Sequence, residues 1–143
     1  MIIEGSTTPI KTFIDSGVLI FAARGEGELA QKALSILEDS NREFASSIFL
    51  KLEVLPKAVY NQKKAEKKFY QTYFDAVSFW ATDLEKIVEQ GLEEATISGT
   101  GAMDSLHLAS AKLLEVDEFI TNEKPNKSIH RSQNIKLISL YNI

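Results

Sequence analysis

Short segments typical of β-strands alternate with longer segments of helical periodicity, and this alternation restricts the fold more than any other feature of the sequence. The strand-like segments lie at 11–14, 43–45, 118–121 and 135–140. Between them, apolar residues recur every three or four positions, as in amphipathic helices. Strands separated by helices favour a parallel sheet. We therefore expect an α/β protein with three α/β/α layers, in which helices cover both faces of a central, mainly parallel, twisted sheet.

The sequence also marks where several helices begin and end. Asp15 is a good N-terminal cap for a helix over 17–23. Ser46 and its neighbour can cap a third helix, which Pro56 should kink or stop. A single apolar stripe, ending at Trp80, predicts one long helix from residue 64 onward. That helix would end at residue 80.

Turn residues organise the second half of the chain in the same way. Thr82 and Glu85 form a capping-box pattern ahead of a further helix. Gly99 and Gly101 mark a loop, and the next helix should begin near Asp104. An acidic side chain at a helix start is favourable for the helix dipole whatever its function.

Composition narrows the class of protein. The 143 residues are 44% hydrophobic and contain no linker-like tract, so we expect a single domain over 1–143. There is no cysteine, which excludes disulfides and thiolate metal sites. The longest apolar run, 18–23, is far shorter than the ~18 residues a membrane span needs. Glu4 and the lack of a basic leader argue against a signal peptide. We expect a cytoplasmic protein without membrane association.

The net charge of −4 is slightly unfavourable for binding nucleic acid, so a protein of this charge that handles a polyanion must reverse the sign locally. One lysine-rich segment, with Tyr60 and Tyr70 interleaved, is a possible contact for RNA. A solvated helix face is the ordinary alternative and the interpretation we favour. The possible RNA-contacting lysines are Lys63, Lys64, Lys67 and Lys68.

Acidic residues occur where ligands bind in parallel sheets, just beyond the carboxyl ends of strands. Asp15 follows the first strand, and Glu123 follows a later strand that ends at Thr121. Glu53 lies in the third helix and Asp104 at a helix start. If these four carboxylates converge, their mutual repulsion requires either raised pKa values or bound cations.

A divalent metal is the natural solution to that repulsion. Oxygen ligands select hard ions such as Mg²⁺ or Mn²⁺, whereas His107 and His130 have no partner at zinc-ligand spacing. A carboxylate cluster holding one or two such ions suits the attack of water on a phosphodiester. His107 shares a helix face with Asp104 and could touch the site, although we favour a packed core histidine.

Asp15 and Glu53 also have structural interpretations that involve no ligand. Asp15 could be only a helix cap, and a glutamate such as Glu53 is usually a solvated residue. Because Glu53 has apolar neighbours, it needs a partner if it is buried.

Four stretches in sequence order resemble a known family. They are residues 13–20 (FIDSGVLI), 46–55, 104–111 (DSLHLASA) and 119–123 (FITNE). Together they resemble the PIN domain (PilT N-terminus), in particular the single-domain VapC-type ribonuclease toxins of prokaryotic toxin–antitoxin pairs. The resemblance runs from about the first strand to the last and implies a PIN-like fold.

The resemblance also implies a metal-dependent endoribonuclease that forms a homodimer and is neutralised by a small antitoxin. Position 123 departs from the family pattern, because Glu stands where Asp is more usual and its extra methylene moves the carboxylate outward. The number of metal ions, one or two, stays open for that reason. The implied residues are Asp15, Glu53, Asp104 and Glu123 as metal ligands and catalytic residues, with the hydroxyls of Ser16 and Thr121 in support.

Two other classes of function remain open at this stage. One is a non-catalytic PIN-like module that binds a protein or RNA, which the glutamate at position 123 makes conceivable. The other is a different metal-dependent phosphohydrolase, or a nuclease acting on DNA, with a similar fold.

Overall fold

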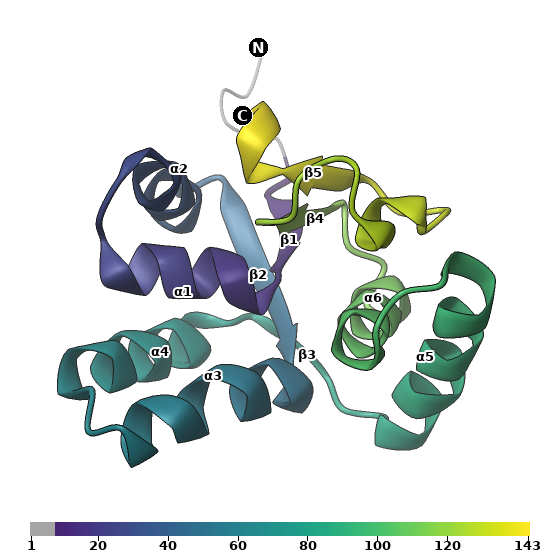
Figure 1. Cartoon of the computed structure of the whole chain (residues 1–143), viewed down its shortest axis with the longest axis horizontal. Helices are drawn as coiled ribbons and strands as arrows, with labels where there is room; N and C mark the ends of the chain where they lie inside the picture. Colours follow the sequence, from purple (N-terminus) through teal and green to yellow (C-terminus); the bar gives the residue numbers. More distant parts are fainter. Residues whose placement is uncertain (1–7) are drawn as a thin grey trace, which may run out of the picture.

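Five parallel strands form the centre of the computed structural model, which describes residues 8–143 (Figure 1). Their spatial order is β3-β2-β1-β4-β5, and every neighbouring pair is parallel. The order places β1 in the middle, so the chain crosses over first to one side of it and then to the other. The strands are β1 (Ile10–Ile14), β2 (Arg42–Ser47), β3 (Phe79–Ala81), β4 (Glu118–Thr121) and β5 (Leu137–Ser139).

Helices cover both faces of this sheet, as Figure 1 shows. Ile14 of β1 packs in the core cluster with residues of α1 to α4, whereas Phe13 packs with α6 on the opposite face. The three-layer α/β/α arrangement expected from the sequence is therefore confirmed. The helices are α1 (Ser16–Arg24), α2 (Glu28–Leu37), α3 (Ile48–Tyr60), α4 (Lys64–Ala76), α5 (Leu84–Ser98) and α6 (Ala102–Leu113), with short 3₁₀ turns at Ser128–Arg131 and Leu140–Asn142.

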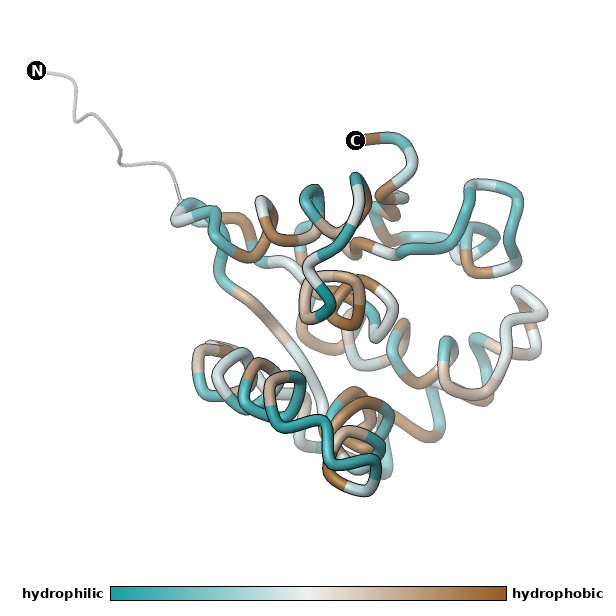
Figure 2. Tube along the Cα trace, turned by 60° about the vertical axis from the view of Figure 1, so that its left-hand side comes forward, coloured by the Kyte–Doolittle hydropathy of each residue, from teal (hydrophilic) through white to brown (hydrophobic). Residues whose placement is uncertain are grey.

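Local caps fix the helices that follow β1 and β2. The Asp15 carboxylate accepts a hydrogen bond from the Val18 amide at 3.1 Å, and α1 ends at Gly25 with a φ of 70°. The Ser47 hydroxyl accepts one from the Phe49 amide at 3.2 Å. Along the helices, hydrophobic residues are interspersed with hydrophilic ones (Figure 2). Apolar residues that recur every three or four positions bury one face of a helix.

The expectation of one long helix over residues 64–80 is wrong. α4 ends at Ala76, Val77 is extended, and Trp80 lies in β3, where it pairs with Ser46 of β2. The backbone hydrogen bonds offered by the edge of β2 draw these residues out of the helix, although their apolar spacing would also suit a helical turn.

Two smaller expectations about helix ends also differ from the structure: α3 does not stop at Pro56, where a kink stays a prediction, and another residue caps α5. Pro56 lies inside α3, which continues to Tyr60 because Leu50, Val54 and Ala58 anchor it in the core. The lost hydrogen bond and ring clash cost roughly 3 kcal/mol, and this packing offsets them. The cap of α5 is Asp83 rather than Thr82, with its carboxylate accepting from the Lys86 amide at 3.2 Å.

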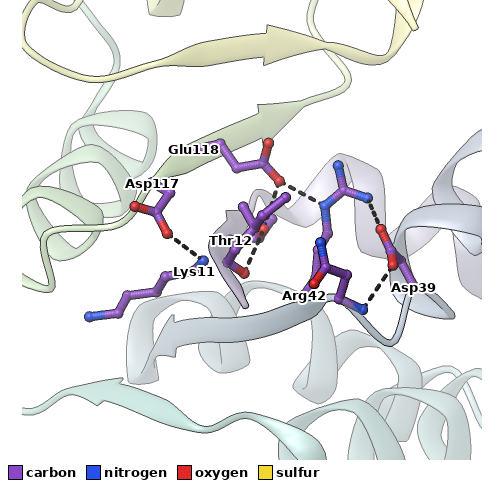
Figure 3. A network of polar contacts seen from close by, with 8 residues as sticks. Lys11, Thr12, Asp39, Arg42, Asp117 and Glu118 are labelled. Carbon is purple, nitrogen blue, oxygen red and sulfur yellow. Dashed lines mark hydrogen bonds and ion pairs between the residues drawn. The ribbon is translucent and has the colours of Figure 1, made fainter. Parts of the chain in front are cut away.

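A buried ion pair joins the amino-terminal ends of the strands (Figure 3). The predicted site lies at the opposite end of the sheet, beyond the carboxyl ends of the strands. The Arg42 guanidinium lies 2.8 Å from both Glu118 and Asp39, and the Thr12 hydroxyl donates to Glu118 at 2.7 Å. These contacts tie β1, β2 and β4 together.

Three sequence expectations concern the chain as a whole. Among residues 8–143, no helix is long and apolar enough to cross a membrane. Glu4, which bears on the absence of a leader, lies outside the described residues. The single domain over 1–143 stays a prediction.

Candidate active site

Asp15 stands at the centre of the carboxyl edge of the sheet. It follows β1, and its own amide donates to the Ile120 carbonyl of β4 at 3.1 Å. The Thr121 hydroxyl donates to its second carboxylate oxygen, so both oxygens are held, and the side chain is 4% exposed. Burial raises the pKa of Asp15 to about 6, although the bonds from Thr121 and Val18 act in the opposite direction.

The turn after β4 is held by its backbone. The Glu123 amide donates to the Thr121 hydroxyl at 3.0 Å. Its carbonyl accepts from Ser139 at 2.7 Å and from the His130 ring at 3.1 Å. Thr121 therefore links the Asp15 carboxylate directly to the segment that carries Glu123.

Glu53 comes from α3 and meets a histidine of α6. The His107 Nε2 donates to the Glu53 carboxylate at 2.7 Å. This bond is the main reason that the pKa of Glu53 is lowered, and a hydrogen bond from the Ser16 hydroxyl lowers it further. His107 is only 1% exposed, so it is a core histidine as expected, but its side chain also takes part in the site.

Asp104, in the first turn of α6, is close enough to the other acidic side chains for their charges to shift its pKa or for its charge to shift theirs. Burial raises its pKa, and the charges of Glu123 and Glu53 raise it further, against the effect of His107. The charge of Asp104 in turn contributes to the raised pKa of Asp15. Asp104 thus lies within electrostatic reach of Asp15, Glu53 and Glu123. The Thr121 hydroxyl holds Asp15, and the Ser16 hydroxyl lies beside Glu53.

The donor set fits a hard divalent cation by its chemistry. The side chains of the site offer carboxylate oxygens, and a cation would favour the charged forms of Asp15 and Asp104, whose pKa values burial raises. Within residues 8–143, no three His, Asp or Glu side chains are already arranged as a metal-binding group. Joint coordination therefore requires the carboxylates to move closer together.

Gly17 is a residue of the site that the sequence analysis did not single out. A methyl group at Gly17 would lie 2.0 Å from the Asn122 side chain, which packs directly over the glycine. The close approach lets the first turn of α1 lie against the segment between Thr121 and Glu123. A glycine in the first turn of a helix was the available signal.

The four lysines proposed as RNA contacts are all exposed, but they do not share one surface hollow. Lys63 lines a hollow that also contains Glu53. Lys68 lines a separate, apolar hollow with Phe44 and Tyr73. Lys64 and Lys67 line neither of these hollows.

Comparison with solved structures identifies several similar folds. A chain of a toxin–antitoxin complex from Klebsiella pneumoniae is 19% identical, with a TM-score of 0.69 over 92% of this chain and 99% of that one. A chain of VapBC2 from Rickettsia felis, bound to a DNA fragment from their promoter, is 15% identical, with a TM-score of 0.70 over 91% and 98%. A chain of FitAcB from Neisseria gonorrhoeae is 13% identical, with a TM-score of 0.62 over 92% and 99%.

These similarities extend over nearly the full length of both chains in each pair, and they confirm the PIN-like fold expected from the sequence. No protein-family model matches the sequence. No curated protein matches it either. At these identities the comparisons establish the fold, and the chemistry has to be argued from the site itself.

Proposed function

We propose that this protein is a Mg²⁺- or Mn²⁺-dependent endoribonuclease that hydrolyses RNA phosphodiester bonds, as the toxin of a type II toxin–antitoxin pair. The main support is that Asp15 is buried at the carboxyl ends of the strands, where Thr121 and Val18 hold its two oxygens. Asp104 lies within electrostatic reach of it and of Glu53 and Glu123. The fold, shared with chains of toxin–antitoxin complexes, agrees with this proposal.

Each residue of the site has a proposed role. Asp15, Glu53 and Asp104 would hold the first ion, with Glu123 contributing to it or to a second. When bound there, such an ion would supply an activated water and charge stabilisation at the leaving oxygen. Thr121 orients Asp15, while Ser16 and His107 orient Glu53. The expected products carry a 5′-phosphate and a 3′-hydroxyl.

The direct test is cleavage of a labelled single-stranded RNA with Mg²⁺, Mn²⁺ or EDTA. Asp15→Asn and Asp104→Asn remove ligand charge with little change of volume, so we expect each to abolish cleavage while circular dichroism shows a folded protein. Asp83→Asn is the matched control, because Asp83 caps α5 as Asp15 caps α1. Metal-dependent cleavage by both site variants would contradict the proposal.

The proposed partners follow from the same assignment. They are an RNA substrate, a small antitoxin and a second copy of this chain. The absence of cysteine is compatible with the reducing cytoplasm, where we place the protein. Co-expression with the product of a small neighbouring reading frame tests the antitoxin: its binding should suppress the cleavage described above.

A second candidate function, a non-catalytic PIN-like binding module, is favoured by one observation. Glu53 already has a close partner in His107, at 2.7 Å. Calorimetric titration with Mn²⁺ separates the two functions, since the nuclease should bind the ion and the module should not. A parallel assay on DNA distinguishes the ribonuclease from a nuclease acting on DNA.

A further inference from the structure

A surface hollow opens beside Glu53, between α1 and the α3–α4 pair. Its volume is about 150 Å³, several times the ~30 Å³ that one water molecule occupies in the liquid. One wall is formed by Ile20 and Arg24 of α1. From Ser16, beside Glu53, to Arg24 the helix rises about 12 Å. The hollow therefore leads away from the acidic site along α1.

The charged side chains that line this hollow are mainly basic, in contrast to those of the acidic site. Arg24, Lys57 and Lys63 line it, and Glu66 is the only acid besides Glu53 among the lining residues. Arg24 lies 3.4 Å from Glu66, but its side chain is 66% exposed, so this contact is weak and Arg24 can turn toward a ligand. The lining thus offers three cations beside the end of the acidic cluster.

An exposed aromatic ring lies at the C-terminal end of α3, close in sequence to residues that line the hollow. Tyr60 is 87% exposed, and the next residue, Asn61, lines the hollow. Exposed rings beside cationic grooves provide stacking platforms for the bases of single-stranded nucleic acid. This ring favours RNA over an acidic peptide, because a peptide of carboxylates would use only the cations.

We propose that the hollow lined by Arg24, Lys57 and Lys63 binds backbone phosphates of the RNA beside the scissile one, with Tyr60 stacking on a base. The inference rests on the proposed function, and it retains one of the four lysines that the sequence offered as possible RNA contacts. Lys63 belongs to this subsite, whereas Lys64, Lys67 and Lys68 lie outside it. Lys57, one helical turn after Glu53, adds the cation nearest the acids.

The test measures binding of a labelled single-stranded oligoribonucleotide by fluorescence anisotropy in EDTA, where metal-dependent cleavage does not occur. The double variant Lys57→Ala/Lys63→Ala should weaken binding about tenfold. The slope of log K against log salt should become shallower by roughly 1.4, about 0.7 for each lost phosphate contact. The matched control, Lys64→Ala/Lys67→Ala, removes the same charge from outside the hollow and should bind RNA as the wild type does.

Two further measurements sharpen the test. Tyr60→Leu should weaken RNA binding several-fold, and Tyr60→Phe should retain it. In the presence of Mn²⁺, the Lys57→Ala/Lys63→Ala variant should raise KM for a long oligonucleotide and leave kcat nearly unchanged.

Equal losses in the two lysine double variants would overturn the subsite while leaving the proposed function intact. An oligoglutamate peptide that binds through Lys57 and Lys63 more tightly than RNA would also overturn it. A wild-type protein that neither binds nor cleaves RNA would instead reject the proposed function.

Discussion

At the scale of single residues, Asp15 both caps a helix and carries a buried charge. Burial raises its folded-state pKa from 3.8 to about 6. Between these pH values the folded protein retains a proton that the unfolded chain has lost. The contribution of Asp15 to stability therefore falls as pH rises through this window, by about 3 kcal/mol in total, and is constant above it.

The expected consequence is a pH-dependent effect of Asp15→Asn on the metal-free protein. Asn caps helices as well as Asp does, but it does not ionise. Denaturant unfolding in EDTA should show the stability of the variant rising relative to wild type between pH 4 and 6.5, by up to about 3 kcal/mol. Asp83→Asn, at an exposed cap, should show much less of this trend. A difference independent of pH would contradict the electrostatic account of Asp15.

His107 should position Glu53 through its hydrogen bond rather than by packing alone. His107→Leu removes the hydrogen-bond donor and fills a similar volume with an apolar side chain. His107→Gln retains a nitrogen donor. We expect Mn²⁺ affinity, measured by calorimetry, to fall about 10- to 100-fold in His107→Leu and to recover largely in His107→Gln. Equal affinities in the two variants would reduce His107 to a packing residue.

At the scale of elements, the ends of β1, β2 and β4 depend on the buried ion pair of Figure 3. The Glu118 side chain is only 5% exposed, so Arg42→Leu leaves it without its cation. We expect a loss of about 3–5 kcal/mol in urea unfolding. Glu28→Ala breaks an ion pair whose carboxylate is 86% exposed, and it should cost less than about 1 kcal/mol.

The same variant separates stability from function. Arg42 lies at the sheet edge opposite Asp15, so Arg42→Leu should leave Mn²⁺ affinity unchanged where the protein is folded. Adding Glu118→Gln to Arg42→Leu should restore part of the stability, because the unpaired charge is removed. If it restores none, the lost interaction is not the ion pair.

At the scale of the whole molecule, exposed apolar residues concentrate on two helices. Of the ten exposed large hydrophobic residues in the described part of the chain, eight lie on α3 and α5. Ile48 of α3 and Leu84 of α5 line one hollow of about 330 Å³, together with Lys51, Trp80, Ala81 and Thr82. An exposed apolar surface shared by two helices can pack against the same surface of a second copy across a two-fold axis.

We therefore expect the proposed homodimer to form through this α3–α5 surface. Leu52 is 63% exposed beside Ile48, and Leu52→Glu should convert the dimer to a folded monomer in analytical ultracentrifugation. Ile143→Glu, at an exposed apolar position elsewhere, should remain dimeric. A monomeric wild type, or a dimeric Leu52→Glu, would contradict this interface.

Local patterns in the sequence were sufficient to predict the class of fold, four of the five strands and most helix starts. These features are local: strand and helix periodicities and caps such as Asp15 and Ser47 act within a few residues. The order of acids after strands then predicted a shared edge, because parallel strands end on the same side. The set of site acids stays a prediction.

Other features depend on tertiary contacts: the end of α4, the continuation of α3 past Pro56, and the pairs of side chains that meet. Trp80 joins β3 because the edge of β2 lies beside it, and Glu53 meets a histidine 54 residues away. Lys63 lines a hollow that Lys64, Lys67 and Lys68 do not line. Such outcomes depend on contacts between distant segments, whose energies exceed local preferences and leave no periodic signal in the sequence.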